Sequence, residues 1–177
     1  GITTRVARAE VDIGIGSLVG RVASIIACEK LLSAPLGLLG QTAQLPTGKS
    51  VRMGDVRGAR LLKEPDDTSI AHLLATHGSD LLSQMDSGTE VSSLAIQLAM
   101  AQAGVGFAVL SALGASHPEA TGRRFRPLRP RLHREVFLMH HLDHPADEAT
   151  TVTCEAIRSA LIRATLHASV KRQPLAA

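Results

Sequence analysis

The sequence predicts an α/β fold divided into two lobes. Apolar residues make up 45% of the 177 residues and charged residues only 20%, which is typical of a packed globule rather than a disordered chain. Strand-like apolar runs alternate with helical patterns along the chain. A helix leads into a strand twice, over residues 6–16 and over residues 92–111. Two such units predict two lobes with a cleft between them, where proteins commonly bind small molecules.

The first half of the chain is expected to start in a helix. Ile2, Val6 and Ala9 keep helical spacing before a strand at residue 11. A largely apolar run ended by Gly40 is typical of a strand covered on both faces. The expected elements are a helix over 1–9, strands over 11–16, 24–28, 35–40 and 59–63, a helical turn over 51–56, and a helix over 70–77. One of Asp67, Thr68 and Ser69 is expected to cap this last helix.

The second half repeats the alternation. A short strand over 84–91 feeds an apolar helix that begins near Ser92, and Gly104-Val105-Gly106 connects this helix to a strand over 107–110. A loop, a strand over 134–140 and a long helix capped within 145–147 complete the chain. Strands that alternate with helices favour a parallel sheet with right-handed crossovers, in which ligands bind beyond the carboxyl ends of the strands.

Composition excludes several classes of protein. With three Phe and no Tyr or Trp, the chain has little to stack on bases or sugars. The net charge of +3 and the isoelectric point near 9.3 come mostly from residues 123–134 and from Lys171-Arg172. We interpret the 123–134 run as a solvated loop, with a phosphate-binding patch as the alternative. No stretch approaches the about 20 apolar residues of a membrane span. No contact with membranes is therefore expected.

Two cysteines indicate the compartment. Cys28 and Cys154 are far apart and match no metal-ligand spacing, so reduced thiols in a cytoplasmic protein are expected, with a disulfide as the alternative. Neighbouring histidines such as His140 and His141 point to opposite faces of a strand, so with Asp143 and His144 they indicate a solvated strand end rather than a metal site.

Motifs for cofactors and catalysis are also missing. The pairs Gly14-x-Gly16 and Gly104-x-Gly106 lack the third glycine of a dinucleotide site, and the chain has no G-x-S-x-G elbow. No catalytic residue, metal or cofactor is therefore predicted.

Four segments carry a resemblance to a known family. Residues 9–16 (AEVDIGIG), 30–39 (KLLSAPLGLL), 92–110 and 132–143 (LHREVFLMHHLD) resemble, in order and spacing, motifs of the effector-binding domain of LysR-type transcriptional regulators. Two departures stand out: Ser111 occupies the position of the family's proline after the Gly-x-Gly strand, and the usual His-Pro-Leu is Gln44-Leu45-Pro46.

The resemblance implies a type 2 periplasmic-binding-protein-like fold, with two Rossmann-like lobes joined by crossing strands. Residues 1–39 with 140–177 would form lobe I, and residues 40–139 lobe II. It further implies a domain that senses a small-molecule effector held between the lobes and that reaches DNA only through a winged helix-turn-helix domain absent here. It also implies that the full-length protein forms a homodimer or homotetramer. The family's first strand and helix are also absent, so a truncated domain is expected.

The effector-binding residues are predicted from strand ends. The turn from Glu64 to Ser69 follows a strand and opens a helix, whose free amides favour an anionic group. Its acidic residues instead favour a cationic or hydroxylated effector. The candidates are Gly16, Ser17, Gln41, Glu64, Pro65, Thr68, Ser69, Val105 and Phe107. Simpler interpretations are a plain tight turn at Gly16-Ser17, a cap at Thr68 or Ser69, and a core position for Phe107.

Two alternatives to the sensor remain. One is a periplasmic solute-binding protein of the same fold, and the other is an enzyme built on it. The first predicts a secretory signal upstream, and the second predicts a reactive residue in the cleft. The sequence shows neither, so a non-enzymatic sensor is the preferred interpretation.

Overall fold

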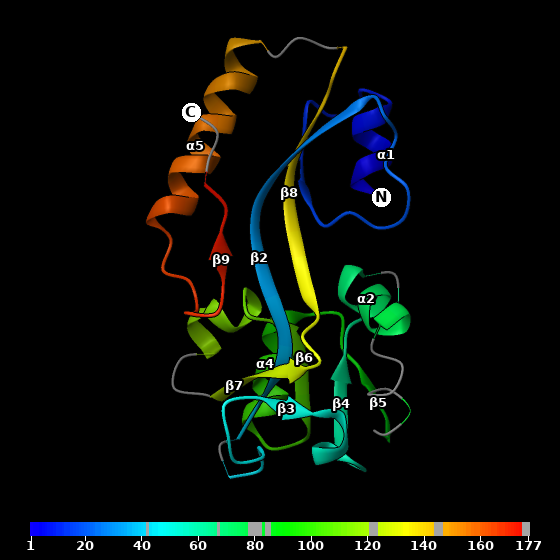
Figure 1. Cartoon of the computed structure of the whole chain (residues 1–177), viewed down its shortest axis with the longest axis vertical. Helices are drawn as coiled ribbons and strands as arrows, with labels where there is room; N and C mark the ends of the chain where they lie inside the picture. The colour runs from blue at the N-terminus through cyan, green and yellow to red at the C-terminus, as the bar shows by residue number, and fades with distance from the viewer. Residues whose placement is uncertain are drawn as a thin grey trace. The chain divides into compact units, whose positions relative to one another are not determined.

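The computed structural model describes residues 1–41, 43–66, 68–77, 83, 86–120, 124–143 and 147–174 (Figure 1). The chain divides into two compact units. Unit 1 comprises residues 1–33, 135–165 and 171–177, and unit 2 comprises residues 34–134 and 166–170. None of the helices in the described part combines the length and the apolar character needed to span a bilayer.

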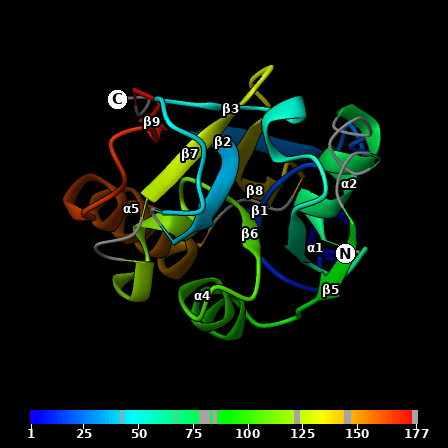
Figure 2. The same ribbon diagram turned by 90° about the horizontal axis from the view of Figure 1, so that it is seen from below.

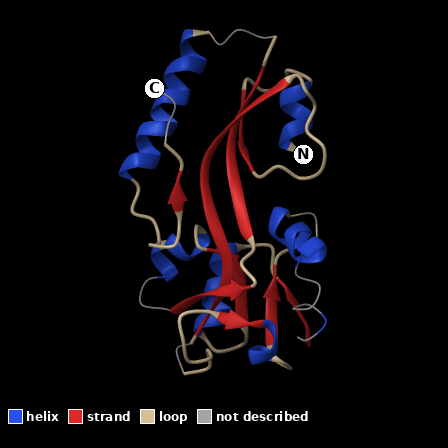
Figure 3. Ribbon diagram, viewed as in Figure 1, coloured by secondary structure: helices blue, strands red, loops and turns tan. Residues whose placement is uncertain are grey.

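Unit 1 is a small sheet with one helix on each side (Figure 3). Its elements are α1 (Ile2–Ala7), β1 (Ile13–Gly16), the first part of β2 (Ile26–Gly40), most of β8 (His133–His141), α5 (Glu148–Arg163) and β9 (Lys171–Arg172). The strand order is β1, β8, β2, with β9 also paired to β2. The pairs β1 with β8 and β2 with β9 are antiparallel. The helix expected over 1–9 and the strand expected over 11–16 are confirmed.

The two faces of the unit 1 sheet carry separate apolar clusters. On one face Val6 of α1 packs with Ile26 and Met139, and on the other Leu31 packs with Leu138 and Cys154 of α5. Because side chains alternate along a strand, Cys28 shares the face of Ile26, opposite to Cys154. Both cysteines are free. Partial burial raises the pKa of the Cys28 thiol.

Charged pairs add a second kind of contact in unit 1. The Arg158 guanidinium of α5 donates to both carboxylate oxygens of Glu29, with Nη2 2.6 Å from Oε2. This hydrogen bond holds the pKa of Glu29 below its usual value and raises that of Arg158. Lys30 pairs with Glu135 of β8. The side chains of Glu29 and Arg158 are 26% and 32% exposed, so water screens their attraction only in part.

Unit 2 contains the second part of β2 and most other strands, seen from below in Figure 2. Its elements are β3 (Val51–Arg52), the 3-10 helix η1 (Met53–Val56), β4 (Arg60–Lys63), α2 (Ser69–His77), β5 (Asp86–Glu90), α4 (Leu94–Gln102), β6 (Phe107–Ser111), η2 (Gly114–Ser116), η3 (Pro118–Ala120) and β7 (Arg124–Arg129). The order across the sheet is β7, β2, β6, β4, β5, and β3 pairs with β7.

The strand directions in unit 2 are mixed. The pairs β4 with β5, β4 with β6, and β3 with β7 are parallel, whereas β2 is antiparallel to both β6 and β7. The expected parallel organisation therefore holds only locally. The strand expected over 59–63, the helix over 70–77 and the helix-to-strand unit over 92–111 are present.

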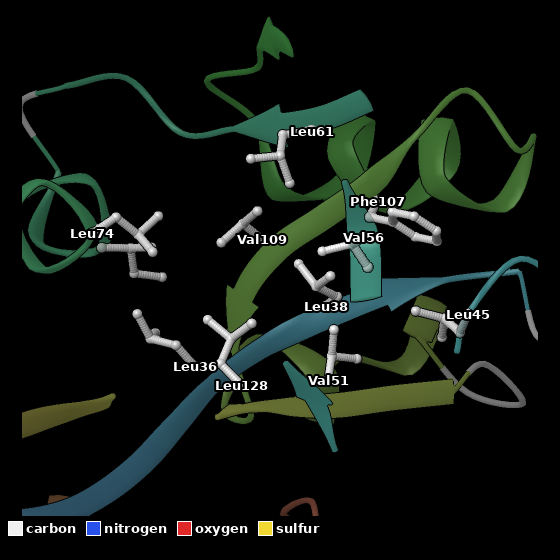
Figure 4. Close-up of a cluster of buried hydrophobic side chains, with 11 residues drawn as sticks. Leu36, Leu38, Leu45, Val51, Val56, Leu61, Leu74, Phe107, Val109 and Leu128 are labelled. Atoms are coloured by element: carbon white, nitrogen blue, oxygen red, sulfur yellow. The ribbon is translucent and has the colours of Figure 1, made fainter. Parts of the chain in front are cut away.

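One apolar core fills the space between α2 and the unit 2 sheet (Figure 4). Leu74 of α2 points toward Leu61 of β4 and Val109 of β6. Other buried members are Leu36, Leu38, Leu45, Val51, Val56, Ile70, Phe107 and Leu128. Helix α4 covers the opposite face, where Gln97 Nε2 donates to the Leu62 carbonyl at 2.8 Å. Helices α2 and α4 thus lie on opposite faces of the same strands.

Two predictions about strands are wrong. The segments over 24–28 and 35–40 are one 15-residue strand, β2, because the residues between them also pair with strands of unit 1. The arginine-rich run is not a solvated loop: residues 124–129 form β7, with Phe125 and Leu128 buried and the strand paired to β2. The strand was not predicted because its two buried apolar residues stand among arginines and a proline. Arg123 lies outside the described residues.

Candidate functional site

The turn that follows β4 opens helix α2. Leu61 and Leu62 are buried in β4, and the chain turns at Pro65, whose carbonyl accepts from the Thr68 amide at 3.1 Å. Thr68 Oγ1 then accepts from the Ala71 amide at 3.2 Å, which makes Thr68 the N-cap. The expected cap is therefore confirmed at Thr68, while Asp67 lies outside the described residues.

The first turn of α2 carries backbone amides that the described residues leave without an acceptor. The amides of Ser69 and Ile70 donate to no residue in the described part of the chain, as is usual for the first positions of a helix. The Thr68 and Ser69 side chains are half-buried beside them and add hydroxyl groups. The positive end of the helix macrodipole lies at the same place. This arrangement suits a ligand atom that accepts hydrogen bonds.

Charged side chains of both signs flank these donors. Lys63 ends β4, and Glu64 and Pro65 follow it, all three half-buried, whereas Asp66 is exposed. An anionic group at the amides would meet repulsion from Glu64 and Asp66, and a cationic group would be attracted by them. The segment that opens α2 thus combines hydrogen-bond donors with carboxylates within a few residues.

The carboxyl ends of three strands meet at this edge of the unit 2 sheet. Strands β4, β5 and β6 are parallel, so their ends at Lys63, Glu90 and Ser111 share it. The Val91 amide donates to the Lys63 carbonyl at 2.7 Å. Helix α4 also starts here, capped by Ser93, whose Oγ lies 3.5 Å from the Ile96 amide.

Ser93 and Ser111 are polar residues of this edge that were not predicted as site residues. The Ser111 hydroxyl is buried and has no hydrogen-bond partner within the described residues. The signal that could have found Ser111 was its departure from the proline of the family motif. Ser93 is the N-cap of α4, one residue beyond the start expected near Ser92.

Three predicted residues lie at the opposite edge of the unit 2 sheet. Because β2 is antiparallel to β6, its end at Gln41 lies near the start of β6, where Val105 and Phe107 also lie. Gln41 Nε2 donates to the Gln102 carbonyl at 2.8 Å. Val105 is 39% exposed, and Phe107 is buried in the core. The structure therefore does not bring these residues together with Thr68 and Ser69.

Gly16 and Ser17 belong to unit 1. Gly16 ends β1 opposite Phe137 of β8, and Ser17 is half-buried just beyond it. A Cβ on Gly16 would make only an ordinary contact with Ile2 of α1, at 3.4 Å, so packing does not require a glycine here. Their contact with an effector stays a prediction.

The histidines at the end of β8 take part in local hydrogen bonds. The Asp143 amide donates to His141 Nδ1 at 3.1 Å, and His140 Nδ1 lies 3.2 Å from the His141 carbonyl. Among the described residues no group of three or more metal-ligating side chains is present. His144 lies outside the described residues.

A family model described as the LysR substrate binding domain matches residues 1–162. The chain resembles the reduced OxyR regulatory domain from Pseudomonas aeruginosa, with 20% identity, 89% of this chain and 75% of that chain covered, and a TM-score of 0.66. It also resembles the MetR regulatory domain from N. meningitidis (12% identity, 98% and 80% covered, TM-score 0.69). A third similar structure is the Synechocystis PCC6803 CcmR regulatory domain in complex with 2-PG (14% identity, 92% and 79% covered, TM-score 0.70). No curated protein matches the chain.

Proposed function

This chain belongs to the LysR substrate-binding domain family, and we propose that it recognises its small-molecule effector with the residues that open helix α2. Its fold is the type 2 periplasmic-binding-protein-like fold of LysR regulatory domains. The match to effector-binding domains of transcription regulators does not favour the alternatives, a periplasmic solute-binding protein or an enzyme.

One observation carries the choice of site. The amides of Ser69 and Ile70 lack partners in the described chain, and they lie next to the hydroxyl groups of Thr68 and Ser69 at the carboxyl end of a parallel strand. Ligands of open α/β sheets bind beyond such strand ends. The Thr68 hydroxyl accepts from Ala71 and still has its own proton to donate. Glu64 and Pro65 would border the ligand in this proposal.

The charges at the turn narrow the effector chemistry. A carboxylate or hydroxyl would accept from the amides, and an ammonium or hydroxyl would be attracted by Glu64 and Asp66. Effectors that carry both kinds of group, such as amino acids and hydroxylated acids, fit the turn better than simple dianions. We also propose, as a separate point, that Gly16 and Ser17 at the end of β1 in unit 1 contact an effector.

A thermal-shift screen tests the proposal. Organic acids, amino acids and hydroxylated aromatic metabolites are tested, because a ligand that binds only the folded state raises the unfolding temperature. Calorimetric titration then gives the affinity of each compound that raises the unfolding temperature. Ser69→Ala and Thr68→Ala are expected to weaken binding roughly tenfold each through the lost hydroxyl contacts.

Matched variants separate binding from helix stability. Thr68→Ser keeps both the cap and the hydroxyl and should retain most of the affinity. Thr76→Ala removes a threonine from the other end of α2, where its Oγ1 only donates to the His72 carbonyl, and should bind as the unchanged protein does. Equal affinity of Ser69→Ala, Thr68→Ala and the unchanged protein would contradict this site.

Further parts of the proposal concern the wider protein. We expect no catalytic turnover of any bound effector, and DNA binding through a separate domain. We also expect a homodimer or homotetramer in the full-length regulator. Turnover of a compound that binds, measured by mass spectrometry after incubation, would contradict the sensor interpretation.

A further inference from the structure

A polar cavity lies in unit 2, apart from the turn that opens α2. It measures about 340 Å³, within the lower range of ligand pockets. Its lining shares no residue with the turn that opens α2. The lining residues are Thr47, Gly48, Lys49, Ser50, Arg52, Asp55 and Arg129.

Strand pairing brings two arginines of the cavity together. Strands β3 and β7 are parallel, and their register places Arg52 directly opposite Arg129. Buried neighbours fix both strands, because Val51 and Leu128 pack in the unit 2 core. The two like charges are therefore held side by side by the sheet, at a cost in repulsion that an anion would relieve.

The loop before β3 adds a third cation. Lys49 lines the cavity with Thr47 and Ser50, whose hydroxyl groups can donate hydrogen bonds. Gly48 has a φ of +125°, a conformation that side chains rarely adopt, so this bend of the loop needs glycine. The loop thus presents one charge and two hydroxyls to the same cavity as the arginines.

Asp55, the carboxylate among the described lining residues, offsets one of the three cationic charges. Asp55 Oδ2 accepts from the Arg52 backbone amide at 2.9 Å, which fixes it at the start of η1. Three cations and one carboxylate leave the lining with two positive charges (3 − 1 = 2). None of the three cations forms an ion pair with another residue in the described part of the chain.

We propose that this cavity is an anion site for a doubly charged phosphate group, either inorganic phosphate or the phosphate of a small phosphomonoester. Arginine forks bind phosphate oxygens in pairs, and a lysine with hydroxyl donors completes the set of contacts. The dianion matches the two positive charges. The cavity holds more than a phosphate ion, which leaves space for the rest of a phosphomonoester. This proposal does not depend on the effector site at α2.

Nuclear magnetic resonance titration of the ¹⁵N-labelled chain tests the proposal. Inorganic phosphate is added at constant ionic strength, with sodium chloride as the reference. Saturable shifts of the Gly48, Lys49 and Ser50 amides are expected, while the Ser69 and Ile70 amides stay unchanged. A phosphomonoester such as glycerol phosphate, titrated in parallel, distinguishes the two sources by its tighter binding.

Matched charge variants decide whether the binding is specific. Arg129→Gln and Lys49→Gln should each weaken phosphate binding roughly tenfold, as expected for loss of a charge-assisted contact. Arg124→Gln removes the same charge from the exposed start of β7 and should leave the affinity unchanged. Equal weakening by all three variants, or shifts that grow without saturation, would overturn the proposal. Should Arg129→Gln fail to fold, Lys49→Gln in the loop gives the same test.

Discussion

The two units of this chain are stabilised in different ways. Among the described residues, one cluster of 11 buried apolar residues lies on one face of the unit 2 sheet, whereas unit 1 has two clusters of three, one on each face. Unit 1 also uses charged contacts, such as that between Glu29 and Arg158. Apolar burial supplies most of the free energy of folding. Truncating a buried side chain should therefore lower the free energy of unfolding more in the larger core than in the small clusters. The comparison shows that one strand, β2, contributes both to a large apolar cluster in unit 2 and to small clusters with charged contacts in unit 1.

The largest effect is expected from a cavity in the unit 2 core. Leu38→Ala should lower the free energy of unfolding toward the upper end of about 2 to 5 kcal/mol, because rigid neighbours surround the side chain and leave a void. Leu138→Ala in unit 1 should lie toward the lower end, since the partly exposed Ile13, Ile157 and Leu161 can close on the gap. Hydrogen exchange resolved by peptide measures each unit separately. A larger loss for Leu138→Ala would reverse the comparison.

Helix caps within unit 2 should give an intermediate effect. Thr68→Ala removes a hydrogen bond of 3.2 Å at the start of α2 and should cost about 1 kcal/mol. Ser93→Ala removes a longer contact of 3.5 Å at the start of α4 and should cost less. The protection of amides in the first turn of each helix reports the difference. Similar losses in both helices would show that the distance does not decide the strength of the cap.

The smallest effect, and one confined to unit 1, concerns pH. The pKa of Glu29 is lowered by its hydrogen bond with Arg158, so the pair stabilises the fold above the ordinary value of 4.5. This stability is lost as the pH falls through the lowered pKa of the folded state. A double-mutant cycle with Glu29→Gln and Arg158→Gln should give a coupling of about 0.5 to 1 kcal/mol at pH 7, given the partial exposure.

The control for the Glu29 and Arg158 pair is the same double-mutant cycle measured at low pH. The coupling should disappear once the carboxyl group is protonated. Unit 2 should show no change from these variants, because neither residue contacts its core. A coupling that persists at low pH would mean that packing, rather than charge, holds α5 to β2.

Much of the fold was predictable because the spacing of apolar residues and the helix caps depend only on residues that are close in sequence. Helix α2 has its apolar residues at helical spacing and a hydroxyl cap, and both features were read from the sequence. Strand β7 was missed because Phe125 and Leu128 are its only buried residues among arginines and a proline. Its strand state depends on pairing with β2, which is distant in sequence. The joining of 24–28 with 35–40 into β2 had the same cause.

The candidate site was predictable only in part. The turn at Thr68 followed from the order of a strand and a helix, but the sheet edge that each residue occupies depends on strand direction. A parallel organisation was expected, and the antiparallel β2 places Gln41 at the edge opposite to Thr68. The buried hydroxyl of Ser111 needed the structure, since one serine after an apolar run has many ordinary explanations.

Because β2 is continuous, the number of residues between its contacts in unit 1 and its contacts in unit 2 is fixed. It runs for 15 residues with no loop, placing Ile26 in a unit 1 cluster and Leu36 and Leu38 in the unit 2 core. A loop can absorb an added or deleted residue, but a continuous strand turns every later side chain to the other face. Deletion of one residue near Ser33 would therefore turn Leu36 and Leu38 to the other face of the unit 2 sheet, while the unit 1 part of β2 keeps its register. In β2, length is as tightly constrained as residue type.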